Sequence, residues 1–396
     1  MLPKLINRSP DIMKLRNEGY EVSINGAHLI ISNVPYVNQA SKVCYGTLVS
    51  EISIAQGRAV KPRTHVIHFA GDLPCNKDGA IIESIRNSSK PATVGGVEID
   101  HTFSNKPPNG YADYYHKITQ YVAIISNPAR AINKSVTAKT FKVVEEEDEE
   151  YSLHYVDTNS ARVQIDSISR KLIGLKIGIV GLGGTGSYIL DLVAKTLVEE
   201  IHLFDKDFFL QHNAFRAPGA PSRKMLLGKK KTKVSYLQGI YSKMHKGIKV
   251  HPYNIDQGNL GLLDGLDFVF ICIDKSEPKK YISAYLIEKK VPFIDVGMGI
   301  DRIDDALEGM LRVTLCTPNF TGSIEEKKRV SFADADAEDE YSTNIQIAEL
   351  NLINAGLAVL KWKKYFGIYH DQSNEHHLTL TISLNSILNE DRKTDT

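Results

Sequence analysis

The spacing of hydrophobic residues changes near residue 144, and the change indicates two regions of different structure. Before it, β-branched and aromatic runs at residues 27–32, 65–69 and 120–125 alternate with glycine, proline and asparagine clusters. Runs of this kind predict short strands separated by turns. We therefore expect residues 1–144 to form a β-rich or α+β domain.

After residue 151, apolar runs alternate with amphipathic stretches, which is typical of a parallel sheet connected by helices. The predicted strands are residues 177–180, 201–204, 249–253, 268–273 and 293–296. The predicted helices between them are residues 186–197, 232–245 and 278–289. A late β layer is predicted from a strand at 309–315, a helix at 344–364 and an alternating strand at 378–384. We expect an α/β fold whose C-terminal domain is Rossmann-like and doubly wound.

Six consecutive acidic residues, 145–150, separate the two regions. Their mutual repulsion is unfavourable in a compact element, and no apolar residue gives the run a face to bury. We interpret residues 145–150 as a solvated linker between an N-terminal accessory domain, 1–144, and a C-terminal domain, 151–396.

Composition and charge narrow the class of protein. The 48 basic residues nearly balance the 47 acidic ones, so the overall charge favours neither a nucleic acid nor a membrane surface as a partner. No apolar run approaches the roughly 18 residues of a membrane span, and the N-terminus lacks the apolar core of a secretory signal. The four cysteines are far apart and form no CxxC pair, so we expect no disulfide framework and no zinc. These features predict a cytoplasmic protein.

The most informative motif is a glycine-rich loop directly after the first strand of the second region. Gly181, Gly183 and Gly186 satisfy the pattern G-x-G-x-x-G, and Gly184 adds a fourth glycine. Glycines let backbone amides approach phosphate closely, and the following helix begins with the positive end of its dipole. Asp205 ends the next strand, where an acid binds ribose hydroxyls. Together these residues predict a nucleotide site.

The class of nucleotide depends on residues further along, because NAD and ATP both use such a loop. Asn213, Arg216 and Lys233 supply amide, guanidinium and ammonium groups, which suit a triphosphate whose departing pyrophosphate must be neutralised. Asp274 ends a predicted strand at the sheet edge where ligands bind, and its carboxylate is suited to Mg²⁺. This pattern favours ATP over an NAD-dependent oxidoreductase, the first alternative.

In this order, the motifs between residues 162 and 365 resemble the adenylation domain of the family of ThiF, MoeB and the ubiquitin-activating enzymes. The family pattern is a glycine loop, an Asp-x-Asp strand end, an Asn-x-x-Arg, a helix-opening lysine and an aspartate ending a later strand. These elements fall on residues 181–186, Asp205 and Asp207, residues 213–216, Lys233 and Asp274.

The resemblance implies ATP-dependent adenylation of the C-terminal carboxylate of a ubiquitin-like protein that ends in glycine. It implies that the glycine loop binds the phosphates and that Asp205 binds the ribose. It also implies that Asn213, Arg216 and Lys233 stabilise the triphosphate, and that Asp274 holds Mg²⁺. Adenylation of a non-protein carboxylate and a non-catalytic scaffold are further alternatives.

Two residues are candidates for the helix-opening lysine of the family pattern. Lys231 lies closer to the family's spacing from Gly228, whereas Lys233 is in register with the following predicted helix. We prefer Lys233 and interpret residues 229–231 as a solvated helix start.

The chain departs from the family pattern after the adenylation step. Many members transfer the acyl group to a cysteine in the segment that here spans residues 316–343, whose only thiol is Cys316. Cys316 is therefore the candidate nucleophile, and its alternative role is that of a small buried side chain. If Cys316 is inert, a partner or a hydroxyl of Ser323, Ser331 or Ser342 would accept the acyl group. Cys272 is interpreted as a structural residue of a core strand.

The resemblance also implies partners. It implies a homodimer in which an arginine before the first strand serves the partner subunit. Arg162 is the nearest match in this sequence, and its alternative role is that of a surface arginine. The N-terminal region resembles uncharacterised domains of bacterial proteins linked to ubiquitin-like conjugation, some of them in phage-defence operons. We predict that residues 1–144 recruit the ubiquitin-like protein or a conjugating enzyme.

Overall fold

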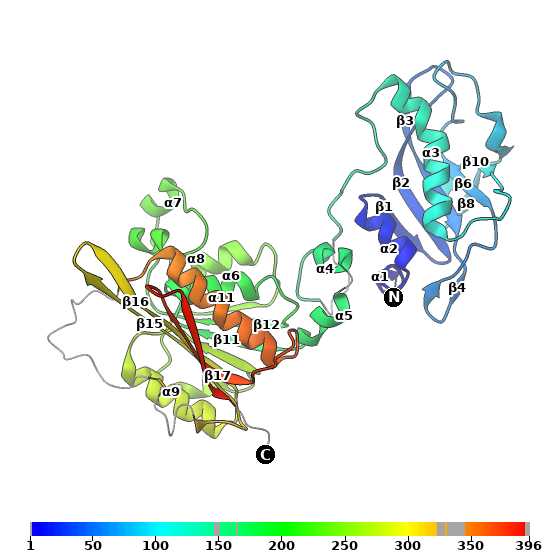
Figure 1. Cartoon of the computed structure of the whole chain (residues 1–396). Helices are drawn as coiled ribbons and strands as arrows, with labels where there is room; N and C mark the ends of the chain where they lie inside the picture. The colour runs from blue at the N-terminus through cyan, green and yellow to red at the C-terminus, as the bar shows by residue number, and fades with distance from the viewer. Residues whose placement is uncertain (1, 146–150, 164, 323–328, 331–344, 393–396) are drawn as a thin grey trace. The chain divides into compact units, whose positions relative to one another are not determined.

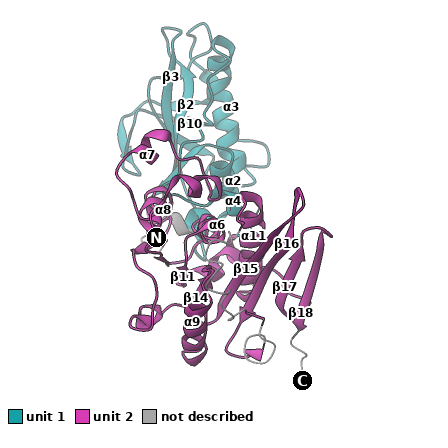
Figure 2. Cartoon of the chain, turned by 90° about the vertical axis from the view of Figure 1, so that its left-hand side faces the viewer, with its two compact units in different colours: residues 1–148, 155–165 teal, residues 149–154, 166–396 magenta. Residues whose placement is uncertain are grey.

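The computed structural model describes residues 2–145, 151–163, 165–322, 329–330 and 345–392. The chain divides into two compact units, one formed by residues 1–148 and 155–165 and the other by residues 149–154 and 166–396 (Figures 1 and 2). Each unit has its own hydrophobic core. Of the predicted acidic linker, only Glu145 belongs to the described residues.

The first unit is built on a six-stranded antiparallel sheet with the strand order β1-β2-β3-β6-β10-β7. Its strands are β1 (Glu21–Asn25), β2 (His28–Val37), β3 (Val43–Glu51), β6 (Val66–Ala70), β7 (Arg86–Ser88) and β10 (His101–Ser104). Two small hairpins pair β4 (Ile54–Ala55) with β5 (Arg58–Ala59), and β8 (Ala92–Val94) with β9 (Val97–Ile99). The helices are α1 (Leu2–Asn7), α2 (Pro10–Asn17), α3 (Tyr114–Ile132) and α4 (Thr158–Arg162). The predicted β-rich character of this region is confirmed.

One predicted strand of the first unit is wrong, because residues 120–125 lie inside the 19-residue helix α3. The β-branched and aromatic residues suggested a strand, but the buried positions follow the helical period, with Ile118, Tyr121, Val122 and Ile125 on the face toward the sheet. Asp113 caps the helix by accepting a hydrogen bond of 2.7 Å from the backbone N–H of His116. Burial of a long amphipathic face outweighs local β propensity here.

Lys117 on α3 is a fully buried lysine without a carboxylate partner among the described residues. Its Nζ donates to Ser50 Oγ at 2.9 Å and to the carbonyl oxygens of Thr64 and Val66 at 3.1 and 2.7 Å. All three ammonium protons are bonded, but the charge of Glu51 offsets only part of the loss of hydration. Burial therefore lowers the pKa of Lys117 to about 8.

The first unit is expected to become more stable as the pH rises from about 8 to about 9.5. In this range folded Lys117 loses its proton while the unfolded lysine, with its ordinary pKa of 10.5, keeps it. The unfolded chain then binds more protons, so the free energy of unfolding rises by up to about 1.4 kcal/mol per pH unit. Below this range both states are protonated and the slope disappears. Amide hydrogen exchange of α3, corrected for intrinsic rates, would measure the slope, and an equal slope in Lys117→Met would contradict the assignment.

The second unit is built on an eight-stranded sheet with the order β13-β12-β11-β14-β15-β16-β17-β18. The parallel part contains β11 (Lys176–Val180), β12 (Glu200–Phe204), β13 (Ile248–His251), β14 (Phe268–Ile271) and β15 (Phe293–Ile303). The antiparallel part adds β16 (Ala306–Cys316), β17 (Glu375–Thr381) and β18 (Ser386–Arg392). Within the parallel part, the order of the strands reverses between β11 and β14, which is the doubly wound arrangement predicted from the sequence.

Helices cover both faces of this sheet (Figure 1). One face packs against α6 (Gly184–Val193), α8 (Lys233–Tyr241) and α11 (Ala348–Tyr365), and the other packs against α9 (Ser276–Glu288). The shorter helices of this unit are α5 (Asp166–Ser169), α7 (Arg223–Leu227) and the 3₁₀ turns η2 to η4 at residues 170–172, 211–215 and 260–263. The 3₁₀ turn η1, at residues 83–85, belongs to the first unit. The predicted Rossmann-like α/β fold is confirmed. No helix among the described residues has the length and apolarity needed to cross a membrane.

Candidate nucleotide and acyl transfer site

The glycine loop connects β11 to α6 and depends on glycine at two positions. Gly181 has a φ of +92°, and a Cβ there would lie 2.6 Å from the carbonyl oxygen of Cys272. A Cβ on Gly186 would lie 1.9 Å from the carbonyl oxygen of Gly181. Gly183 precedes the first residue of α6 and has open space at its Cβ position. The loop thus brings the N-terminus of the ten-residue helix α6 to the edge of a large cavity, whose other lining residues are described below. Backbone amides at a helix N-terminus bind anions well.

Replacing Gly186 with alanine is expected to destabilise the second unit by about 1–3 kcal/mol, because the new methyl group overlaps the Gly181 carbonyl. Thermal unfolding followed by the fluorescence of Trp362, the single tryptophan, reports on this unit. Gly239→Ala is the matched control, since Gly239 lies inside α8 with open space at its Cβ position. An equal Tm for the Gly186→Ala variant and the wild type would contradict the close packing of the loop.

Asp205 follows β12, and its carboxylate links the glycine loop to the loop after β12 by hydrogen bonds. Its Oδ2 accepts from the backbone N–H of Leu182 at 2.8 Å, and its Oδ1 accepts from the N–H of Asp207 at 2.8 Å. The side chain is buried, and Oδ2 also lies 3.3 Å from Nζ of Lys233. A carboxylate has about four acceptor positions, so Asp205 retains capacity for a ribose hydroxyl.

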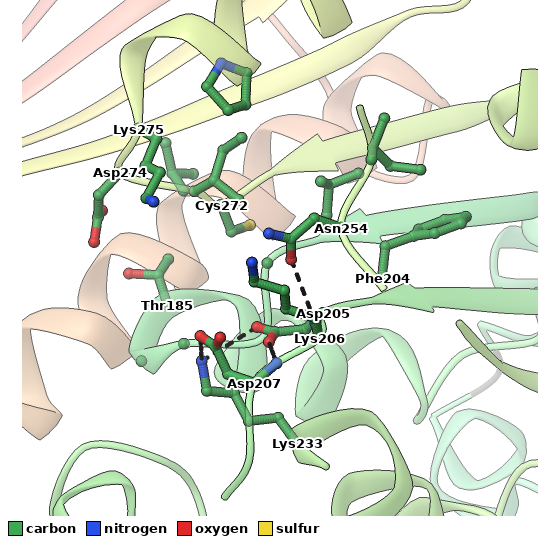
Figure 3. A pocket seen from close by; sticks show the side chains of 18 of the residues that line it. Thr185, Phe204, Asp205, Lys206, Asp207, Lys233, Asn254, Cys272, Asp274 and Lys275 are labelled. Atoms are coloured by element: carbon green, nitrogen blue, oxygen red, sulfur yellow. Dashed lines mark hydrogen bonds and ion pairs between the residues drawn. The ribbon is translucent and has the colours of Figure 1, made fainter. Parts of the chain in front are cut away.

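Lys233 is the first residue of α8, and Figure 3 shows its ammonium group between the two aspartates that follow β12. Nζ lies 2.8 Å from Asp207 Oδ2 and 3.3 Å from Asp205 Oδ2. The bond from Lys233 lowers the pKa of Asp207. Lys231 is exposed and lines a separate groove, so the structure brings Lys233 to the site and leaves Lys231 outside it.

Arg216 also lines the cavity, and its backbone is held by Asn213 in the turn that precedes it. Asn213 is buried, and its Oδ1 accepts from the backbone N–H of Leu210 at 2.8 Å. The Asn213 carbonyl accepts from the N–H of Arg216 at 3.2 Å. Nε of Arg216 is buried without a hydrogen bond to the described residues. Of these two predicted residues, Arg216 is therefore the one placed to meet a ligand.

Asp274 and Cys272 follow β14 on the opposite side of the cavity (Figure 3). Asp274 Oδ2 accepts from Nε2 of Gln346 at 3.2 Å, and its carboxylate remains exposed. Mg²⁺ in nucleotide sites is typically held by one or two carboxylates and the substrate phosphates, so Asp274 fits this role. Among the described residues, no group of three or more histidine, cysteine or acidic side chains could hold a metal alone. Cys272, which we interpreted as structural, lies just beyond β14, where it packs against the core and also lines the cavity. Burial raises the pKa of its thiol.

The cavity enclosed by these residues has a volume of about 790 Å³, which is sufficient for a nucleotide and a short acyl chain. It lies at the carboxyl ends of β11, β12, β13 and β14, where ligands bind in open α/β sheets, and residues 296–298 within β15 complete its wall. Our sequence analysis missed two groups of its lining residues. One follows β13 and comprises Tyr253, Asn254 and Asp256, and the other comprises Gln346, Asn351 and Asn354. Asparagines three residues apart in an apolar helix were the available signal for the second group.

Cys316 and Arg162 are not among the residues that line this cavity. Cys316 ends β16, is 3% exposed and belongs to an apolar cluster with Val269, Leu286 and Phe293. Ser323, Ser331 and Ser342 lie outside the described residues. Arg162 ends α4 in the first unit and is exposed.

Comparisons with known proteins match both parts of the chain. Residues 157–393 match the model of the ThiF family, and residues 10–158 match a domain of unknown function, DUF6791. No curated protein matches the sequence.

Several solved structures are similar to the chain at low identity. E. coli MccB with ATP is 18% identical with a TM-score of 0.46, over 57% of this chain and 66% of MccB, which is just under two thirds of that protein. The microcin C7 biosynthetic enzyme MccB in complex with N-formylated MccA is 18% identical with a TM-score of 0.46, over 78% of this chain and 96% of that one. PaaA is 16% identical with a TM-score of 0.45, over 59% of this chain and 80% of that one.

Proposed function

Because the chain belongs to the ThiF family, we propose that its second unit is an ATP-dependent adenylyltransferase that activates a carboxylate. The observation that carries this proposal is the convergence of Arg216, Lys233 and Asp274 on the cavity of the glycine loop. Two cations and one available carboxylate at a phosphate-binding loop suit a triphosphate better than a dinucleotide.

In the proposed reaction a substrate carboxylate oxygen attacks the α-phosphorus of ATP. A bond forms between that oxygen and the α-phosphorus, the bond from the α-phosphorus to the bridging oxygen breaks, and pyrophosphate leaves with both bonding electrons. Asp205 would orient the ribose, and the amides of the glycine loop would bind the phosphates. Arg216 and Lys233 would neutralise the charge that develops on pyrophosphate. Asp274 would hold Mg²⁺, which neutralises phosphate charge when bound.

The proposed substrate is the C-terminal glycine of a ubiquitin-like protein, and the proposed role of the first unit is to recruit that protein or a conjugating enzyme. Support comes from the order of the adenylation motifs in residues 181–274 and from the separate domain that precedes them. Transfer of the acyl group to Cys316 would require the thiol to leave its apolar cluster. We therefore favour transfer to a nucleophile of the partner, and the role of Cys316 stays a prediction.

Intact-mass measurement tests the acyl transfer step directly. After incubation with ATP, Mg²⁺ and a ubiquitin-like protein, we expect the enzyme to carry no covalent adduct. An adduct that is present in the wild type and absent in Cys316→Ala would show transfer to Cys316 instead.

Binding of nucleotides by calorimetry separates adenylation from the oxidoreductase alternative. We expect ATP with Mg²⁺ to bind and NAD to show no saturable heat. The reason is that the cationic side chains of the cavity neutralise the negative charge of a triphosphate. NAD binding that ATP does not displace would overturn the proposal.

We also propose a homodimer that uses the outer face of α11. This face carries three partly exposed apolar side chains, those of Leu352 (46% exposed), Ile353 (41%) and Leu360 (41%). A cluster of large apolar side chains on a stable helix favours a partner surface. Sedimentation is expected to give twice the chain mass of 44.1 kDa, and Ile353→Glu with Leu360→Glu should give the monomer. Leu384→Glu, at a 73% exposed residue of the β17–β18 turn, is the control, and a dimer that persists in the double variant would contradict this surface.

A further inference from the structure

Two buried asparagines of α11 line the cavity and are not accounted for by the binding of ATP. Asn351 and Asn354 are each 1% exposed and lie one helical turn apart on the same face of the helix. Each has one polar atom without a hydrogen bond to the described residues, Nδ2 in Asn351 and Oδ1 in Asn354. A buried polar atom without a partner is costly, so both atoms are suited to be completed by a ligand.

Asn351 rests directly on the glycine loop. A Cβ on Gly184 would lie 2.1 Å from Asn351 Nδ2, so the absence of a side chain at residue 184 makes room for this amide. Asn351 Oδ1 accepts a hydrogen bond of 2.9 Å from the hydroxyl of Thr185. The remaining NH₂ group is a donor at the loop that would hold the phosphates.

Asn354 has the opposite unused group. Its Nδ2 donates to the carbonyl oxygen of Gly297 at 3.0 Å, which fixes the orientation of the amide, because the reverse orientation would place two acceptors together. Its Oδ1 is therefore an acceptor without a donor among the described residues, and it is suited to an N–H or O–H group of a ligand. Val296, Gly297 and Met298 form the neighbouring part of the cavity wall.

A phosphate group at neutral pH supplies acceptors almost exclusively, so it suits Asn351 Nδ2 but leaves Asn354 Oδ1 without a partner. The ribose hydroxyls of ATP are assigned to Asp205. The adenine amino group is at the opposite end of the nucleotide from the phosphates, whereas Asn354 lies one helical turn from Asn351 at the phosphate loop. The acyl substrate is then the remaining source of the donor, and the donor nearest a peptide's terminal carboxyl group is the backbone N–H of its last residue.

We propose that Asn354 is a specificity-determining residue that accepts a hydrogen bond from the last peptide N–H of the acyl substrate, while Asn351 Nδ2 donates to an oxygen at the reacting carboxyl or α-phosphate. This inference rests on the adenylation function proposed above and adds the residue that would recognise the peptide bond next to the reacting carboxylate. A simple carboxylic acid without an adjacent N–H would leave Asn354 Oδ1 unpaired and would bind more weakly.

Two acyl-adenylate analogues test the proposal on the full chain. The first is adenosine 5′-sulfamate acylated with glycylglycine, and the second has a CH₂ group in place of the peptide N–H. We expect calorimetry to show that the wild type binds the first analogue about tenfold more tightly than the second. In Asn354→Leu the two analogues should bind equally, because the acceptor is removed. Asn254→Leu, on the loop after β13, is the control within the same cavity and should keep the preference of the wild type.

The outcomes separate this inference from the function on which it rests. Equal binding of the two analogues to the wild type, together with normal ATP binding, would overturn the role of Asn354 and leave adenylation intact. Failure of both analogues to bind while ATP binds would contradict adenylation itself. A large loss of ATP affinity in folded Asn354→Leu would place Asn354 against the nucleotide and would also overturn the proposal. The comparison in the wild type needs no variant, so it holds even if Asn354→Leu does not fold.

Discussion

Replacing Lys233 with alanine is expected to lower kcat/KM for ATP-dependent adenylation by about 10³-fold, the largest effect of a single substitution in the site. The ammonium group is buried between Asp205 and Asp207, at 3.3 and 2.8 Å, and lines the cavity beside Arg216. Its removal takes away a cation from the developing pyrophosphate and leaves two neighbouring carboxylates without compensation. Release of pyrophosphate, measured at saturating carboxylate substrate, gives the rate constant.

Lys231→Ala is the matched control for this substitution, because the side chain has the same chemistry two residues away and is exposed outside the cavity. We expect Lys231→Ala to change kcat/KM less than threefold, since exposed charges contribute little. A profile in which Lys231→Ala abolishes activity and Lys233→Ala does not would assign the catalytic lysine to residue 231. Lys233→Arg should restore part of the activity, because the charge is retained but the geometry changes.

Replacing Asp274 with alanine is expected to lower kcat by about 10²- to 10³-fold at physiological Mg²⁺. Its carboxylate is bonded only to Nε2 of Gln346 among the described residues and remains available at the cavity wall. Loss of this carboxylate should weaken the binding of Mg²⁺ more than the binding of ATP. The midpoint of a Mg²⁺ titration of the rate should therefore shift to a higher Mg²⁺ concentration. Asp301→Ala, on the exposed part of β15, is the control and should leave the titration unchanged.

An unchanged Mg²⁺ midpoint in Asp274→Ala would contradict the role of this carboxylate, even if kcat falls. A fall in kcat alone would be consistent with a disturbed bond to Gln346 and the segment that follows it. Gln346→Ala separates the two effects, because it removes that bond and retains the carboxylate.

Those parts of the site that are encoded locally could be predicted from the sequence. The glycine loop and Asp205 lie directly after apolar strands, and Asp274 lies in the loop that follows another. Parallel strands bring their carboxyl ends to one edge of the sheet. The choice of Lys233 over Lys231 also depends on a local feature. Thr232 caps α8 by accepting from the N–H of Ser235 at 3.3 Å, so the helix begins at Lys233 and directs its side chain to the aspartates.

Parts of the site that depend on packing between distant segments were missed. Asn351 contacts the glycine loop 166 residues earlier in the chain, and this contact exists because Gly184 lacks a side chain. No local pattern encodes such a contact. The strand prediction for residues 120–125 was wrong for a related reason. Their conformation depends on the burial of α3 against a sheet whose strands come from distant parts of the chain. The contact of Asn213 Oδ1 with the backbone N–H of Leu210 was likewise not predicted, and the assignment of Asn213 to the triphosphate stays a prediction.

Exchange of labelled pyrophosphate into ATP tests the central claim most directly, because it requires reversible formation of an acyl adenylate. With Mg²⁺ and a ubiquitin-like protein ending in glycine, we predict exchange that depends on that protein and falls by at least about 100-fold in Asp274→Ala and Lys233→Ala. Removal of the terminal glycine carboxylate should abolish it. Exchange that is independent of the carboxylate substrate and unchanged in both variants would contradict the proposed function.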